Sequence, residues 1–306
     1  MYQFTNRYHT YMLNLQRKSR WRKKMRLGKI LLPLTGADSD LRCLRAGLNI
    51  AKRYGAYVEC LFVNRNPTDA LPVAGEALTG QIATELVNAV AEANKRQGAR
   101  AREMFLAAIE EAGVVEGAAR AGSTQAGANF METMGEPGER TAVAARLADM
   151  TVFPIADFAY EIEPTLMEAQ RPCLLLPESS SQQIGKKVMI AWDGGPEAAR
   201  ALSGALPLLE EAAEVTVVTA QNREMDAFAM ESMQTYLASH GIAVRAKQVP
   251  LGSAPVGQVI LAAAADLGAD LLVMGAYGHS RIRELILGGA TRYVIYNARL
   301  AVMMVH

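Results

Sequence analysis

Two apolar runs separated by a helical pattern follow residue 28. The first, KILLPL, has the composition of a strand buried on both faces of a sheet. After a Thr-Gly-Ala-Asp-Ser turn, LRCLRAGLNIAKRYG predicts a helix and AYVECLFV predicts a second strand. Two strands joined in this way form a βαβ unit, which requires parallel strands and a right-handed crossover. The chain is therefore predicted to fold as an α/β protein.

The same succession begins again at residue 187. There KVMIAWD precedes a helical pattern and EVTVVTA follows it, and later ADMTVFPIA corresponds to ADLLVMGAY and RPCLLLPE to RLAVMMVH. We predict two tandem doubly wound domains, each a five-stranded parallel sheet with helices on both faces. Their predicted boundaries are 29–178 for the first domain, 179–185 for a polar linker and 186–306 for the second domain.

Each copy ends in an apolar strand, CLLLP in the first and AVMMVH in the second. An exposed apolar strand at the edge of a sheet invites pairing with another strand. We therefore expect the two last strands to meet across an internal pseudo-twofold axis, so that the chain is an internal pseudo-dimer. Further assembly into a homodimer is compatible with the same pattern.

The first copy contains an extra block of roughly forty residues with a helical pattern. Its apolar positions form a stripe that is predicted to face the core of a long or broken helix. The members of this stripe are Ile82, Leu86, Val90, Met104, Phe105, Ala108 and Ile109.

Charge is distributed unevenly along the chain. Residues 1–28 hold eight Lys and Arg and no acidic residue, whereas the whole chain has a net charge of +1. This basic segment is predicted to be a disordered, solvated extension; binding to nucleic acid or to anionic lipid is the alternative. The chain shows neither the apolar core of a secretory signal nor an uninterrupted apolar run long enough to span a membrane, and we expect it in the cytoplasm.

A glycine-rich segment follows the fourth strand of the second copy. It contains Gly275, Gly278, Gly288 and Gly289, with His279 and Ser280 after the second glycine and Ala290 and Thr291 at the start of the next helical pattern. Glycines let backbone amides approach a ligand, and a helix N-terminus favours an anion. The segment therefore predicts a phosphate site, although the same glycines could serve only as turn and cap residues.

Asp193 ends the first strand of the second copy. In an open α/β sheet, ligands bind outside the carboxyl ends of the strands where the strand order reverses, so Asp193 should face the same place as Gly275. A carboxylate there can accept hydrogen bonds from ribose hydroxyls or help to hold a divalent cation. Alternatively, Asp193 caps the helix that follows Gly-Gly-Pro.

The spacing Gly275-x2-Gly278-x9-Gly288 and the position of Asp193 at the end of a strand resemble the universal stress protein family. The resemblance covers the chain from Lys29 to His306. The resemblance implies an adenine-nucleotide α-hydrolase-like fold, a role in stress survival, and binding of ATP, with Mg²⁺ as a possible companion. It further implies that Asp193 and backbone groups near Val218 and Thr219 hold the nucleoside, and that the three motif glycines take the phosphates.

Two departures from the family pattern bear on this expectation. Gly289 stands where nucleotide-binding members carry Ser or Thr, and the nearest hydroxyl is that of Thr291. The missing hydrogen bond should weaken binding to a charged phosphate by about 1–3 kcal/mol. The first copy has Thr35 in place of Asp193 and lacks the glycine spacing, so its nucleotide site is expected to be degenerate.

The sequence contains none of the common catalytic or nucleotide-hydrolysing motifs. There is no Walker A motif, no Gly-x-Gly-x-x-Gly after the first strand, no nucleophile elbow and no zinc-protease motif. Three scattered cysteines and four histidines predict no metal site. We therefore expect a nucleotide-responsive regulatory protein with at most slow ATP hydrolysis. The alternative is a scaffold that binds no nucleotide and uses the extra helix as a ligand or partner surface.

Overall fold

A computed structural model describes residues 27–70, 80–117, 123–155, 159–179, 184–220, 227–278 and 289–306. Most of the basic segment and of the predicted linker therefore lies outside the described residues. Leu27 is 3% exposed, so the core includes a residue that the sequence assigned to the extension. No helix within the described residues is both long and apolar enough to cross a lipid bilayer.

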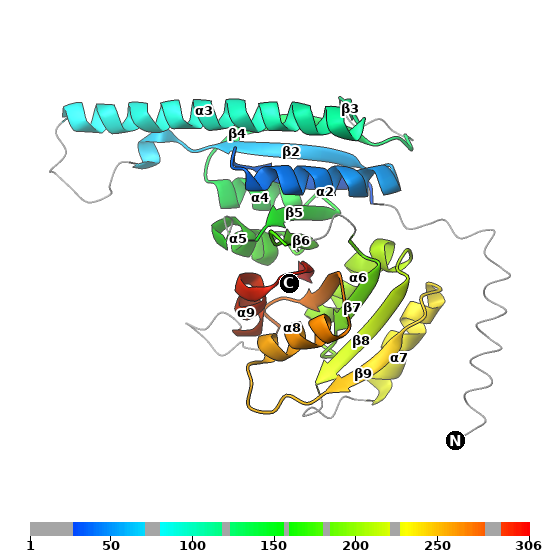
Figure 1. Ribbon diagram of the computed structural model, residues 1–306. Helices are drawn as coiled ribbons and strands as arrows, with labels where there is room; N and C mark the ends of the chain where they lie inside the picture. Colours follow the sequence, from blue (N-terminus) through cyan, green and yellow to red (C-terminus); the bar gives the residue numbers. More distant parts are fainter. Residues whose placement is uncertain are drawn as a thin grey trace, which may run out of the picture.

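The first half of the chain alternates strands and helices, as predicted (Figure 1). Its elements are β1 (Lys29–Leu34), α2 (Ser39–Tyr54), β2 (Tyr57–Asn64), the 3-10 helix η2 (Pro67–Ala70), α3 (Gly80–Ala112), β3 (Val115–Glu116), β4 (Gly127–Met134), α4 (Pro137–Ala145), β5 (Met150–Pro154), α5 (Ala159–Ala169) and β6 (Cys173–Leu176).

The second half repeats the alternation with shorter connections. Its elements are β7 (Lys187–Ala191), α6 (Pro196–Leu209), β8 (Glu214–Ala220), α7 (Ala227–Ser239), β9 (Arg245–Val249), α8 (Val256–Asp266), β10 (Leu271–Gly275), α9 (Gly289–Asn297) and β11 (Ala301–Val305).

The described strands form one sheet in the order β3-β4-β2-β1-β5-β6-β11-β10-β7-β8-β9. Each half therefore has the doubly wound order 3-2-1-4-5, and the two-residue strand β3 adds to the outer edge of the first half. All neighbours are parallel except β6 and β11, which pair antiparallel with Met303 opposite Leu174. The expected meeting of the two last strands is confirmed, and it merges the two sheets into one.

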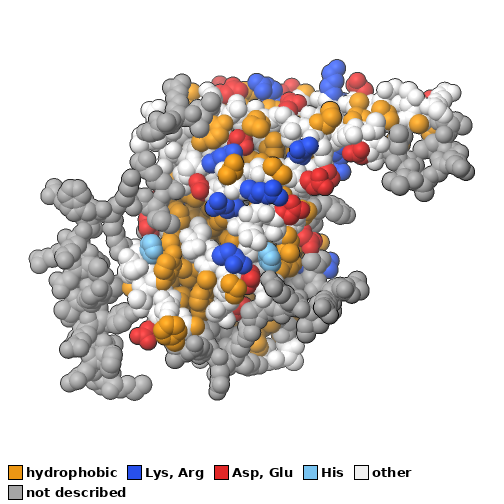
Figure 2. Space-filling view, turned by 180° about the vertical axis from the view of Figure 1, so that it is seen from behind, with side chains coloured by type: hydrophobic (Ala, Val, Ile, Leu, Met, Phe, Trp, Pro, Cys, Tyr) orange, Lys and Arg blue, Asp and Glu red, His pale blue; other side chains and the backbone are white. Residues whose placement is uncertain are grey.

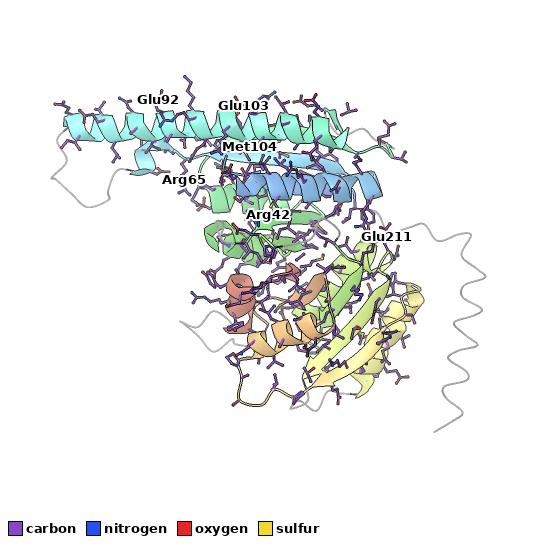
Figure 3. All side chains as sticks on the ribbon, in the orientation of Figure 1. Arg42, Arg65, Glu92, Glu103, Met104 and Glu211 are labelled. Atoms are coloured by element: carbon purple, nitrogen blue, oxygen red, sulfur yellow. The ribbon has the colours of Figure 1, made fainter. Side chains whose placement is uncertain are left out.

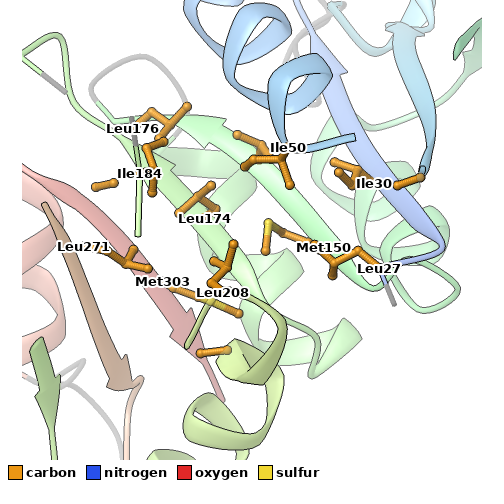
Figure 4. Close-up of a cluster of buried hydrophobic side chains, with 14 of the residues drawn as sticks. Leu27, Ile30, Ile50, Met150, Leu174, Leu176, Ile184, Leu208, Leu271 and Met303 are labelled. Atoms are coloured by element: carbon orange, nitrogen blue, oxygen red, sulfur yellow. The ribbon is translucent and has the colours of Figure 1, made fainter. Parts of the chain in front are cut away.

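Helices cover both faces of this sheet. One continuous core combines α2, α3, α6 and α7 with one face, and it runs across the junction between the halves. Figure 4 shows this continuity: Ile50 of α2 and Leu174 of β6 lie in the same cluster as Leu208 of α6 and Met303 of β11. The opposite face is covered by α4, α5, α8 and α9. Burial of apolar side chains on both faces explains why the inner strands read as uninterrupted apolar runs.

Polar contacts also join the halves where α2 meets α6. The Tyr54 hydroxyl donates to the carbonyl of Pro207 at 2.8 Å, and burial raises the Tyr54 pKa. Arg53 forms an ion pair with Glu211 at 2.7 Å and donates to the carbonyl of Ile184 at 3.1 Å. These contacts place the C-terminal ends of both helices against each other.

The extra block is a single unbroken helix, α3, and its predicted apolar stripe is only half correct. Phe105, Ala108 and Ile109 are buried as predicted, but Ile82 is 48% exposed and Leu86 and Val90 are only half-buried. The reason is length: 33 helical residues span about 50 Å, whereas the eight-residue strands β2 and β4 span about 26 Å. The N-terminal turns of α3 therefore project beyond the sheet, as the space-filling view also shows (Figure 2).

Candidate functional site

The carboxyl ends of β7 and β10 lie side by side in the second half. The two strands are parallel neighbours, with Met274 opposite Ala191. The chain leaves β7 for α6 on one face of the sheet and reaches α9 after β10 on the other face. The strand order reverses between them, so this is the switch point where open α/β sheets bind ligands. Asp193 lies two residues beyond β7 and Gly275 is the last residue of β10, so both residues stand at this edge of the sheet.

Asp193 shapes the turn into α6 without capping the helix. Its Oδ1 accepts a hydrogen bond from the Gly195 amide at 2.8 Å, and Gly194 adopts a left-handed φ of +79°. The residue at the N-cap position of α6 is Gly195, so the helix-cap hypothesis for Asp193 is wrong. The Asp193 side chain is exposed at the carboxyl end of the sheet. It can therefore accept further hydrogen bonds from a ligand.

Val218 and Thr219 lie near the end of β8, beside the end of β7. Ala191 is the register partner of Val218, and the Trp192 amide donates to the Val218 carbonyl at 2.9 Å. Both side chains are buried, at 3% and 2% exposure. The Val218 carbonyl thus already has one partner in the sheet, although a carbonyl oxygen can accept a second hydrogen bond.

The two described motif glycines lie close to α6 but differ in what a side chain there would meet. A Cβ on Gly275 would lie 2.7 Å from the Ala198 amide nitrogen, which is backbone and cannot move aside. A Cβ on Gly278 would lie 2.8 Å from Oε2 of Glu197, the end of a flexible side chain. Gly275 therefore has a packing role whatever it binds, whereas Gly278 keeps the loop open next to a carboxylate.

Glu197 is a site residue that sequence reasoning missed. It lies in the first turn of α6, where an acidic side chain ordinarily favours the helix N-terminus. Its Oε1 accepts from Arg200 at 3.0 Å, while its Oε2 is buried and has no partner among the described residues. A carboxylate facing Gly278 repels a phosphate in the loop. The only sequence signal was its position four residues after Asp193.

Thr291 closes the loop onto the start of α9. The Tyr277 amide donates to the Thr291 hydroxyl oxygen at 3.1 Å, and Tyr277 holds a left-handed φ of 59°. Such a conformation costs a non-glycine residue about 1 kcal/mol or more, and it is often found at functional sites. Thr291 is 3% exposed, so its hydroxyl positions the loop. Burial raises the Tyr277 pKa to about 12, and the charge of Glu163 adds to this effect.

The remaining predicted residues divide into two groups. Gly289 and Ala290 are the first residues of α9, as the sequence indicated, and a Cβ on Gly289 would meet open space. His279, Ser280 and Gly288 lie outside the described residues.

The first half differs from the second at the equivalent place. The Asp40 carboxylate accepts from the amides of Thr35 and Gly36 at 2.9 and 2.8 Å, so these two donors are already used. By strand register, buried Pro154 stands where Gly275 stands in the second half. Gly36 has a φ of +80°, and a Cβ there would lie 2.6 Å from the carbonyl oxygen of Gln97 in α3. The long helix therefore lies directly on the loop after β1.

Metal-binding and thiol chemistry find little support in this fold. The described residues contain no group of three or more His, Cys, Asp or Glu side chains arranged to hold a metal ion. Cys43, Cys60 and Cys173 are buried and unpaired, and burial strongly raises the pKa of each thiol. A thiol with a raised pKa is a poor nucleophile at neutral pH.

Comparisons with known proteins agree with this architecture. Residues 185–306 match the model of the Universal stress protein family. A curated relative, Universal stress protein Slr1230 of Synechocystis, is 28% identical over 146 residues, which cover 46% of this chain and 49% of the relative. The chain thus matches about half the length of that relative.

Solved structures cover more of the chain at lower identity. A universal stress protein from Archaeoglobus fulgidus has a TM-score of 0.63 at 18% identity, covering 92% of this chain and 96% of its own. A putative universal stress protein from Pseudomonas aeruginosa has a TM-score of 0.50 at 14% identity, covering 91% and 93%. At these identities the likeness concerns the fold, which both halves share.

Proposed function

We propose that the second half, whose residues 185–306 match the universal stress protein family model, binds an adenine nucleotide at the carboxyl ends of β7 and β10. The chain would then act as a nucleotide-responsive stress or regulatory protein. The observation that carries the proposal is the convergence of Asp193 with the Gly275–Gly278 loop at the switch point of the second half.

Each group at this place has a distinct part in the proposal. Asp193 accepts hydrogen bonds from the ribose hydroxyls with the carboxylate oxygens that remain accessible. The loop that contains Gly278 brings backbone amides toward the phosphates, and the N-terminus of α9 follows the same loop, where a helix N-terminus favours an anion. Thr291 supports the binding indirectly, because it holds the Tyr277 amide and thereby the shape of the loop.

Glu197 sets a limit on the charge of the ligand. Its buried Oε2 lies close to Gly278 and has no partner among the described residues. Each added phosphate charge near the loop therefore meets repulsion, which the ion pair of Glu197 with Arg200 only partly offsets. The described residues do not assemble a Mg²⁺ site that would offset this repulsion. We therefore propose that the site accepts adenine nucleotides, with an affinity that Glu197 lowers as phosphates are added.

A scaffold that binds no nucleotide is the second candidate. It is favoured by the same Glu197 carboxylate, by the absence of a hydroxyl at Gly289, and by the use of the Thr291 hydroxyl within the loop. In that case Gly275 serves only the packing of α6 against β10. The antiparallel pairing of β6 with β11 supports an internal pseudo-dimer under either candidate.

Isothermal titration calorimetry of the full chain with ATP, ADP and AMP tests the proposal. The key variant is Gly278→Val, because the new side chain would meet only the end of the Glu197 side chain and φ at this position is not left-handed. The matched control is Gly80→Val, at a glycine with open space around it at the start of α3. We expect binding in the micromolar range to be lost in Gly278→Val and kept in the control. If none of the three nucleotides gives a heat of binding, the nucleotide proposal is wrong and the scaffold is the remaining candidate.

A further inference from the structure

We propose that the first half holds a ligand site of its own, a polar cavity beneath α3 that binds a small organic carboxylate. The cavity has a volume of about 150 Å³ and lies at the carboxyl ends of β1 and β2. It is separate from the proposed nucleotide site, which belongs to the ends of β7 and β10 on the other side of the β6–β11 junction.

Helix α3 roofs the cavity because two glycines let it come close. Gly36 admits the backbone of Gln97, as described above, and a Cβ on Gly98 would lie only 3.1 Å from the Phe62 ring. Asn94 and Gln97 reach the cavity from α3, and Thr141 reaches it from α4 on the other face of the sheet. The space is therefore bounded by two strand ends and by helices on both faces.

A buried hydroxyl in the cavity wall has no partner. Thr141 is fully buried, and its Oγ1 makes no hydrogen bond with any described residue. An unpaired buried hydroxyl costs about 1–3 kcal/mol, so native structures usually supply a partner. Thr141 lines the cavity, which makes a polar ligand in the cavity the natural partner.

Arg65 supplies a positive charge at the same place. It follows β2 in the segment beneath α3 (Figure 3), and its carbonyl is held by the Asn94 side-chain amide at 2.7 Å. Its side chain is exposed, and the ion pairs among the described residues do not include it. Figure 3 shows Glu92 and Glu103 on the outer side of α3, away from the cavity. A guanidinium of this kind pairs with a carboxylate through two parallel hydrogen bonds.

Size and charge together select the ligand class. Nucleotide-sized ligands ordinarily need roughly 300 Å³ or more, whereas this cavity has a volume of about 150 Å³. The backbone amides that would cradle a phosphate, those of Thr35 and Gly36, are already bonded to Asp40. The Asp40 carboxylate also disfavours a dianion nearby. The Arg65 cation and the buried Thr141 hydroxyl, with the polar residues Asn94 and Gln97 beside them, suit a singly charged carboxylate with a few heavy atoms.

The test titrates the full chain with L-lactate, pyruvate and inorganic phosphate by isothermal titration calorimetry and thermal shift. We expect at least one of the two carboxylates to bind saturably, with the same affinity when ATP is present, and phosphate to bind more weakly. Arg65→Gln and Thr141→Val should each weaken that binding by about tenfold, the usual loss for one charge-assisted or buried hydrogen bond.

Matched controls separate this effect from a general loss of structure. Arg96→Gln removes the same charge from an exposed position of α3 that does not line the cavity. Thr151→Val removes another buried, unpartnered hydroxyl that lies elsewhere, in β5. Both controls should bind like the wild type. The proposal is wrong if neither carboxylate binds at millimolar concentration, if phosphate binds more tightly, or if the two cavity variants bind as the controls do.

Discussion

The two halves of the sheet have the same strand order, but different side chains and loops surround the switch point in each half. In the first half, Asp40 uses the amides of the loop after β1, and α3 lies on that loop. In the second half, the carboxylate of Asp193 is exposed at the end of β7, and a glycine loop follows β10. One topology therefore supports a strand end whose loop amides are already bonded and a strand end whose carboxylate is exposed, and a few side chains decide between them.

The extra length of α3 in the first half also shows which part of the fold an insertion changes. The helix after the second strand has 33 residues in the first half and 13 in the second. The longer helix leaves the strand order unchanged and instead covers the end of the sheet. Insertions on the surface of an α/β fold are tolerated for this reason, and they change the ligand site more readily than the core.

The strongest test of the comparison is Gly275→Val. The new side chain would press on the backbone of α6, so we expect a loss of about 3 kcal/mol in the free energy of unfolding. Urea denaturation measures this loss. Gly278→Val is the control, because its side chain meets only the Glu197 carboxylate. Equal stability of the two variants would contradict the packing role of Gly275.

Thr35→Asp asks whether one carboxylate restores an open site in the first half. The Thr35 hydroxyl lies 3.4 Å from Oδ1 of Asp40, so the new carboxylate would meet a like charge. We expect the free energy of unfolding at neutral pH to fall by about 2 kcal/mol, and Thr35→Asn to lose much less. The nucleotide stoichiometry should not rise, because α3 still lies on the loop. A second molecule of ATP bound per chain would contradict this expectation.

Glu197→Gln tests whether the Glu197 charge lowers the affinity of the second half for phosphates. Removing the charge beside Gly278 should raise the affinity for ATP by about fivefold and leave that for adenosine unchanged. Calorimetry with both ligands checks this, with Glu210→Gln at the far end of α6 as the control. If ATP and adenosine respond alike, the phosphates do not pass Gly278.

The smallest expected effect concerns Tyr277. Burial raises its pKa from 10.0 to about 12, so the folded state resists ionisation and loses stability as the pH rises through this window. Tyr277→Phe should make stability less dependent on alkaline pH without changing it near neutrality. Tyr54→Phe should instead lower stability near neutral pH, because its hydroxyl donates to the Pro207 carbonyl. Urea denaturation at pH values of about 9, below this window, and about 11, inside it, distinguishes the two variants.

Particular residues show how far sequence reasoning reaches. The apolar runs at β1, β5, β7 and β10 predicted buried parallel strands, and the motif spacing led to the place where Asp193 meets Gly275. The prediction that the apolar stripe of α3 is buried was correct for only half of the stripe, because a helical pattern does not reveal how far a helix extends past its sheet. Glu197 escaped notice because an acidic residue in the first turn of a helix is ordinary.

The amino-acid pattern by itself determined the α/β class and the repeated order of strands and helices, because these depend on local periodicity, and the glycine spacing indicated a candidate phosphate site. Tertiary structure alone decided that Glu197 faces Gly278, that Asp40 occupies the loop amides of the first half, and that Arg65 and Thr141 share a cavity beneath α3. These features join residues that are distant in the chain or that differ in function only through burial and pairing. Such relations arise when the elements pack, and no local pattern encodes them.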